Sequence, residues 1–106
     1  MGHAWFFKRE WLQYLWKEKP PTWDNGEDIQ FAYSAQKYGG IQTYCPPHPP
    51  GDIQMHGSIM GNELGIDNKA TSTNSNVSHQ QFFSERDICV QHGLKNGWDT
   101  VRSIKI

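Results

Sequence analysis

Apolar residues recur at helical spacing in three parts of the chain. Trp11, Tyr14 and Leu15 fall at positions i, i+3 and i+4, and similar spacings follow in two later segments. The pattern predicts three helices, at residues 8–17, 27–38 and 79–92.

Signals that start and stop helices flank two of these segments. Asn25 precedes the second helix, with Asp28 three residues further on, which is typical of an N-cap. Gly39-Gly40 follows that helix and favours a left-handed C-cap. Ser78 and Gln81 form a capping-box pattern that predicts the start of the third helix.

Strand signals are shorter and weaker. Residues 41–45 are β-branched or aromatic and predict a strand, and residues 100–106 alternate loosely and predict a terminal one. Residues 5–7 form either a third short strand or the entry to the first helix. Residues 51–77 are rich in Gly, Asn, Ser and Thr and predict a long surface loop. We therefore expect one α+β domain over residues 1–106, with about three helices and two or three short strands.

Charge and cysteine content narrow the function classes. Lys and Arg number 10 against 11 Asp and Glu, so no basic excess predicts nucleic-acid binding. No apolar run reaches the ~18 residues of a membrane span, and the N-terminus lacks the order of regions found in a signal peptide. Cys45 and Cys89 fit two reduced thiols better than a bridge. A cytoplasmic protein is expected.

Glu27 and Asp28 form an acidic pair within Trp23-Asp-Asn-Gly-Glu-Asp28. Acids in the first turn of a helix lie at the positive end of its dipole, so one interpretation is that the pair only stabilises the helix. Alternatively, one carboxylate projects into a cleft and acts as a general base, for which it must reach a substrate hydroxyl. Trp23 precedes the pair in a loop, and an exposed indole there would stack on the face of a sugar.

Two histidines are further candidates. His48 lies in a proline-rich loop, where it either contacts substrate in a cleft or is an ordinary exposed residue. His79 begins the third predicted helix and is either a metal ligand or a first-turn residue. No two histidines show the i, i+4 zinc spacing with an acid between them.

Three motifs together point to a family. They are Gly26-Glu-Asp-Ile-Gln-Phe-Ala-Tyr33, Gln36-Lys-Tyr-Gly-Gly-Ile-Gln-Thr-Tyr44 and Pro46-Pro-His-Pro49. This region resembles the acceptor side of a bacterial-type family 2 glycosyltransferase. Weaker similarities at Gly2–Trp11, Gly57-Ser58 and Gly97-Trp98 extend the resemblance over nearly the whole chain.

The resemblance implies an inverting transfer of a sugar from a nucleotide-sugar donor to an acceptor hydroxyl. It implies Asp28, the second acid of the pair, as the general base, with Glu27 beside it. It also implies Mg²⁺ or Mn²⁺ to neutralise the departing diphosphate, and His79 as a late metal ligand. The fold implied is the C-terminal half of an A-type glycosyltransferase fold.

The sequence departs from this family in its donor half. It contains no Asp-X-Asp metal motif, no βαβ unit and no glycine-rich phosphate loop. His56 also stands where the family pattern would have tryptophan. We therefore expect an acceptor-side portion that, alone, binds neither nucleotide sugar nor metal well.

Two alternatives to a catalytic role remain open. The chain is either a noncatalytic carbohydrate- or protein-binding module built from that half, or an inactive fragment. An acceptor half without its donor half should expose apolar surface, so its expected partners are a sugar acceptor and either a donor-half chain or a second copy.

Overall fold

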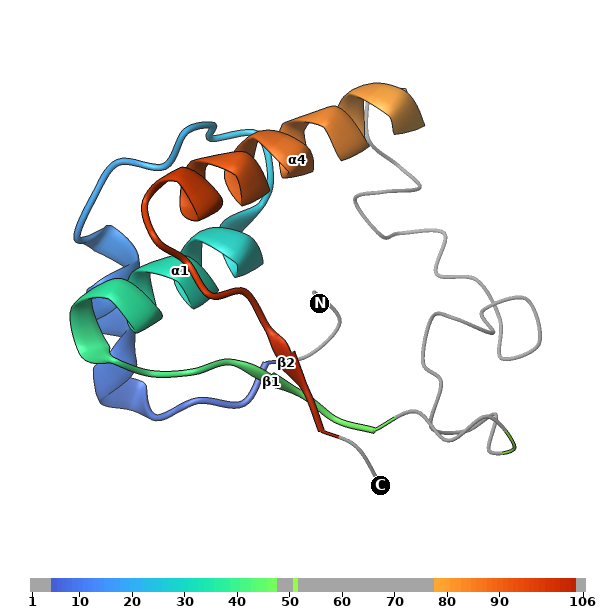
Figure 1. The fold of residues 1–106 in the computed structure, drawn as a ribbon. Helices are drawn as coiled ribbons and strands as arrows, with labels where there is room; N and C mark the ends of the chain where they lie inside the picture. The colour runs from blue at the N-terminus through green and yellow to red at the C-terminus, as the bar shows by residue number, and fades with distance from the viewer. Residues whose placement is uncertain (1–4, 48–50, 52–77, 105–106) are drawn as a thin grey trace.

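The computed structural model describes residues 5–47, 51 and 78–104. These ranges contain, in chain order, η1 (Arg9–Trp16), α1 (Glu27–Gly39), β1 (Tyr44–Cys45), α4 (His79–Lys95) and β2 (Arg102–Ser103). The helices α1 and α4 lie side by side, and each is followed by one of the strands (Figure 1). The described residues thus combine three helices with a small parallel sheet, which confirms the expected mixture of helix and strand.

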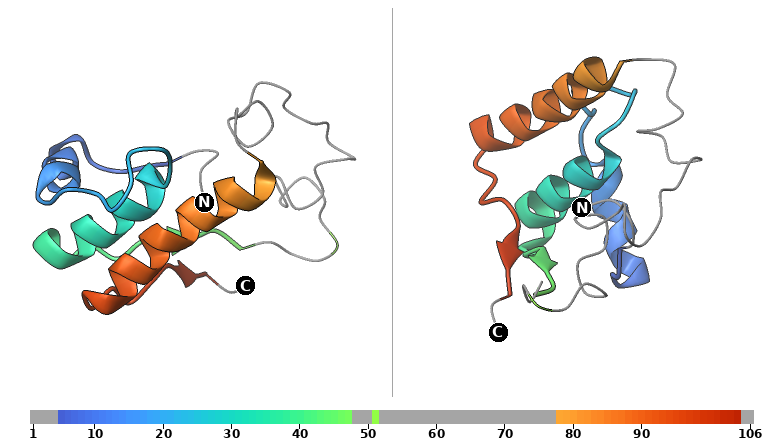
Figure 2. Two further views of the ribbon diagram at one scale, coloured as in Figure 1. Left: turned by 90° about the horizontal axis from the view of Figure 1, so that it is seen from above. Right: turned by 90° about the vertical axis from the view of Figure 1, so that its right-hand side faces the viewer.

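α1 is the central helix, because η1 packs on one side of it and α4 on another (Figure 2). All residues from Asp28 to Ala35 are buried. A helix buried all round needs neighbours on every side. Phe31 contacts the N-terminal segment, with ring centroids 6.3 Å from Trp5 and 5.0 Å from Phe7.

The core lies between α1 and α4. It is formed by Ile29, Ala32, Tyr33, Cys89 and Trp98, with Val90 and Val101 packed against them. This small cluster is the main apolar contact that holds the two helices together.

Glycines set both ends of α1. Gly26 is the N-cap residue, with a φ of 88°, and a Cβ there would lie 2.5 Å from the Cys89 Sγ. Gly40, with a φ of 64°, ends the helix, as predicted from Gly39-Gly40. The predicted N-cap role of Asn25 is wrong. Its Nδ2 instead donates to Glu85 Oε2 at 2.7 Å, which ties the loop to α4.

α4 begins as predicted, since the Ser78 Oγ accepts a hydrogen bond from the Gln81 backbone N–H at 3.1 Å. It continues to Lys95, three residues beyond the predicted end at residue 92. The glycine that suggested the earlier end, Gly93, lies inside the helix, where the Trp98 ring packs against it. The backbone N–H of Trp98 also donates to the Gly93 carbonyl at 2.9 Å.

The first predicted helix forms, but as the 3₁₀ helix η1. Within it no residue is fully buried, and the predicted stripe of Trp11, Tyr14 and Leu15 is only half-buried. Its main anchor is Tyr14, whose ring lies so close to Gly39 that a Cβ there would be 2.7 Å away.

β1 and β2 pair in parallel, with Tyr44 opposite Arg102 and Cys45 opposite Ser103. Both strands fall within the predicted segments but are only two residues long. β2 starts late because Thr100 has a φ of 61° and its carbonyl accepts from the Gln42 side chain instead of a strand partner. Residues 5–7 form no strand.

Across the described ranges, no helix has both the length and the apolar character needed to cross a bilayer. The predicted loop at residues 51–77 lies outside these ranges apart from Gly51.

Candidate functional site

A partly open pocket of about 130 Å³ lies at the N-terminal end of α1. The end of η1, the following loop and the first turn of α1 form its walls. Its lining residues are Leu15, Trp16, Pro20, Thr22, Trp23, Asp24, Asn25, Gly26, Glu27 and Gln30. This volume lies below the range typical of pockets that enclose a drug-sized ligand, so the pocket suits contact with one small group or one sugar ring.

Two indoles border the pocket and remain largely in solvent. Trp16 is 70% exposed and Trp23 is 68% exposed. Exposed indoles leave a large apolar surface in water, which stacking on a ligand would cover. The sequence predicted Trp23 at this position but gave no signal for Trp16.

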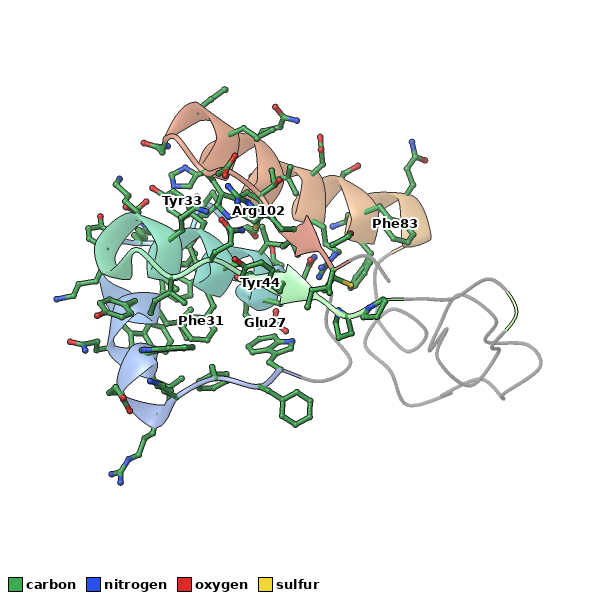
Figure 3. All side chains as sticks on the ribbon, turned by 60° about the horizontal axis from the view of Figure 1, so that its bottom comes forward. Glu27, Phe31, Tyr33, Tyr44, Phe83 and Arg102 are labelled. Carbon is green, nitrogen blue, oxygen red and sulfur yellow. The ribbon has the colours of Figure 1, made fainter. Side chains whose placement is uncertain are left out.

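The side chains of Glu27 and Asp28 lie in different environments. Glu27 is exposed and lines the pocket, as its position at the start of α1 allows (Figure 3). Asp28 is buried, with its side chain 2% exposed, and both of its oxygens accept from the Arg86 Nη2, at 3.1 and 2.9 Å. Successive helix residues differ by about 100° in direction, so only one of the two can face the pocket.

The loop that carries Trp23 is fixed at both ends. The Thr22 Oγ1 accepts from the Asp24 backbone N–H at 3.2 Å, which closes a tight turn. Asn25 donates to Glu85, as described above, and to the Phe82 carbonyl at 3.4 Å. These bonds hold Trp23 and Asp24 beside the first turn of α1.

A second polar cluster forms around Glu18, which lies just after η1 and contacts side chains of both α1 and α4. Its Oε1 accepts from the Tyr33 hydroxyl at 2.8 Å and lies 2.9 Å from the His92 Nε2. Its Oε2 accepts from the Tyr38 hydroxyl at 2.6 Å and the Lys37 Nζ at 3.1 Å. Tyr33 lies between α1 and α4 (Figure 3), and its ring packs edge-on against His92.

The environment of Glu18 favours its charged form. Burial raises its pKa, but hydrogen bonds from Tyr38, His92, Tyr33 and Lys37 outweigh burial and lower the pKa to about 2. Burial also raises the pKa of the Tyr33 hydroxyl, which stays a hydrogen-bond donor. The sequence did not reveal this cluster, because Glu18 and His92 are 74 residues apart. The spacing of Tyr33 and Lys37 on one helix face was the only local signal.

Both cysteines are free thiols, as predicted. Cys89 is buried in the core between the helices, and burial raises the pKa of its thiol. The thiol is therefore neutral and serves in packing rather than as a nucleophile.

The histidine predictions lie beyond what the structure describes. His48 falls outside the described residues, as do His56 and the expected loop, and only the backbone of His79 is described, at the start of α4. Within the described part of the chain, no group of three or more His, Cys, Asp or Glu side chains could hold a metal ion.

Comparisons with protein families, with curated proteins and with solved structures found no match to this chain.

Proposed function

We propose that this chain binds a saccharide at the pocket and is the acceptor-side part of an inverting glycosyltransferase. The observation that carries the proposal is the pocket itself, where Trp16 and Trp23 present exposed indoles beside the carboxylate of Glu27. An indole offers a flat apolar surface to the C–H face of a sugar, and a carboxylate accepts hydrogen bonds from its hydroxyls.

The chemistry proposed is a single displacement. The acceptor hydroxyl attacks the anomeric carbon of a nucleotide sugar, the new glycosidic bond forms, and the bond to the nucleoside diphosphate breaks. A carboxylate of this chain takes the proton from the hydroxyl, as a general base does when it lies within hydrogen-bond reach.

The positions of the two acids divide their roles. The family resemblance implies Asp28 as the base, but in this conformation Arg86 holds both of its oxygens and its side chain is 2% exposed. Glu27 is exposed and faces the pocket. We therefore assign proton removal to Glu27 and give Asp28 the task of fixing α1 on α4. A base role for Asp28 requires its release from Arg86.

The implied Mg²⁺ or Mn²⁺ has no identified ligands among the described residues. Donor binding is therefore assigned to a partner chain or to further sequence. His48 and His79 stay predictions as substrate and metal contacts.

A noncatalytic carbohydrate-binding module is the second candidate. It is favoured by the burial of Asp28, which keeps the residue that the family uses as base away from the pocket. The two candidates share the saccharide site and differ only in transfer.

Titration calorimetry of this chain against a panel of neutral, cationic and anionic oligosaccharides tests the shared part. We expect Trp23→Ala to weaken binding by up to about tenfold, since an aromatic stacking contact contributes roughly 0.5–1.5 kcal/mol. Phe6→Ala is the matched control, because Phe6 is 96% exposed and does not line the pocket. If no oligosaccharide binds, or if Trp23→Ala binds like the unaltered chain, the proposed site is wrong.

Product formation with UDP- and GDP-sugars, Mn²⁺ and the best-binding saccharide separates the two candidates. Transfer that is lost in Glu27→Gln supports the enzyme with Glu27 as base. Transfer that survives in Glu27→Gln but is lost in Asp28→Asn returns the base role to Asp28. Saccharide binding without transfer, even when donor-half sequence is supplied, favours the module.

A further inference from the structure

The side chains around the pocket carry charge of one sign only. Asp24 and Glu27 are both exposed and both line it, and none of its ten lining residues is basic. The nearest lysines in sequence, Lys17 and Lys19, are not among the residues that line it. The pocket therefore attracts positive charge.

The dipole of α1 opposes this attraction but does not cancel it. The N-terminus of a helix acts as roughly half a positive charge, and the pocket lies beside it. Asp28 contributes little further charge, because Arg86 neutralises it at 2.9 Å. Among the groups that line the pocket, the two carboxylates therefore outweigh the half charge of the helix end.

The indoles add to the same preference. The face of an indole ring is the negative side of its quadrupole, and among aromatic side chains it binds cations best. Trp16 and Trp23 are the two most exposed tryptophans among those described. A ligand that combines an apolar ring face with a positive charge would use both the rings and the acids.

We infer that the pocket selects an amino sugar whose amine is free and protonated. This inference rests on the proposed saccharide binding and names its substrate class. The ring of such a sugar packs on Trp23 while its ammonium group donates to the carboxylates of Glu27 and Asp24. N-acetylation removes the positive charge, and a uronic acid brings a negative one, so both classes should bind more weakly.

Calorimetry with three oligosaccharides of equal length tests the inference: one of glucosamine, one of N-acetylglucosamine and one of galacturonate. At about pH 6 and low salt, where a free amine is protonated, we expect the glucosamine oligomer to bind about tenfold more tightly than the N-acetylated one. The preference should fall with added salt, because the acids are exposed.

The double variant Asp24→Asn with Glu27→Gln should bind the glucosamine and N-acetylglucosamine oligomers equally. Glu10→Gln is the control, since Glu10 is exposed and does not line the pocket. It should keep the full preference. Circular dichroism confirms that each variant folds.

The outcomes separate this inference from the proposed function. If the three oligomers bind equally and Trp23→Ala weakens them all, charge selection is overturned and saccharide binding stands. If the double variant keeps the preference for glucosamine, the acids are not its source and the inference fails. If none of the three binds, the inference fails, and the proposed saccharide site fails with it only if the wider panel of oligosaccharides also shows no binding.

Discussion

One ion pair joins the candidate site to α4. Asp28 is buried, and its only charged partner among the described residues is Arg86, whose side chain is 24% exposed. Asp28→Asn removes the negative charge and leaves the guanidinium with a weaker acceptor. We expect a loss of about 2–3 kcal/mol in the free energy of unfolding, somewhat below the cost of breaking a fully buried pair.

Urea unfolding followed by circular dichroism measures this loss. Glu27→Gln is the matched control, because it changes the neighbouring acid on the exposed side of the same turn and should cost less than about 0.5 kcal/mol. A double-mutant cycle with Arg86→Gln isolates the pair itself. Additive effects in that cycle would mean that Asp28 and Arg86 do not stabilise one another.

Acid should weaken the fold through Glu18. Its pKa falls from the ordinary value of 4.5 to about 2 in the folded chain. Below about pH 4.5 the unfolded chain binds a proton at this carboxylate and the folded chain does not, so the contribution of Glu18 is lost progressively between pH 4.5 and about 2. A shift of this size corresponds to a few kcal/mol, on the order of 3, because each pH unit is worth about 1.4 kcal/mol.

Urea titrations across that pH range give the measurement. Glu18→Gln should lower the free energy of unfolding near neutral pH and reduce its fall below about pH 4.5. Glu10 is an exposed acid, so Glu10→Gln should leave this fall unchanged. If stability falls as steeply with acid in Glu18→Gln as in the unaltered chain, other carboxylates cause the acid sensitivity.

The residues of the candidate site could be predicted where they lie close together in the sequence. Trp23 and the acids fell close together along the chain, and the pocket indeed includes Trp23 and Glu27. The partner of Asp28 was not predictable, because Arg86 is 58 residues away along the chain. That long-range pairing decides which acid faces the pocket.

At the scale of elements, Gly26 sets how closely α1 approaches α4. Gly26→Ala would strain a φ of 88° and place a Cβ 2.5 Å from the Cys89 Sγ. Gly40→Ala, with a φ of 64° and no neighbour within 4 Å, would carry only the backbone strain. We expect about 1 kcal/mol for Gly40→Ala and 2–4 kcal/mol for Gly26→Ala.

Thermal and urea unfolding of the two variants tests this difference. Cys89→Ala in the Gly26→Ala background should recover part of the loss, since it removes the sulfur that the new methyl group meets. Equal destabilisation of the two glycine variants would show that the contact between the helices adapts at no cost.

Helix positions followed from periodicity and caps, and all three predicted helices formed. Their finer features depended on tertiary contacts. Trp98 packs on Gly93 and lets α4 run to Lys95, and Asn25 bonds to Glu85 instead of capping α1. Neither contact has a local signal, because each partner comes from a different element or lies beyond the helix end.

At the scale of the whole molecule, the described residues leave the parallel sheet partly uncovered. Parallel strands are usually covered on both faces, yet Tyr44 is 57% exposed and Ile104 is 48% exposed. The net charge of −1 provides little repulsion between copies. We therefore expect the chain to self-associate and to bury this sheet against a second copy.

Sedimentation velocity over a wide concentration range tests this expectation. Tyr44→Lys combined with Ile104→Lys should shift the chain to monomer, because two lysines resist burial and repel their counterparts in the other copy. Ile88→Lys combined with Leu94→Lys is the control, since these residues are 49% and 46% exposed and belong to α4 and not to the sheet. Only the sheet variant should dissociate. A monomer at every concentration would exclude self-association, and dissociation by the α4 variant alone would move the interface to the helix.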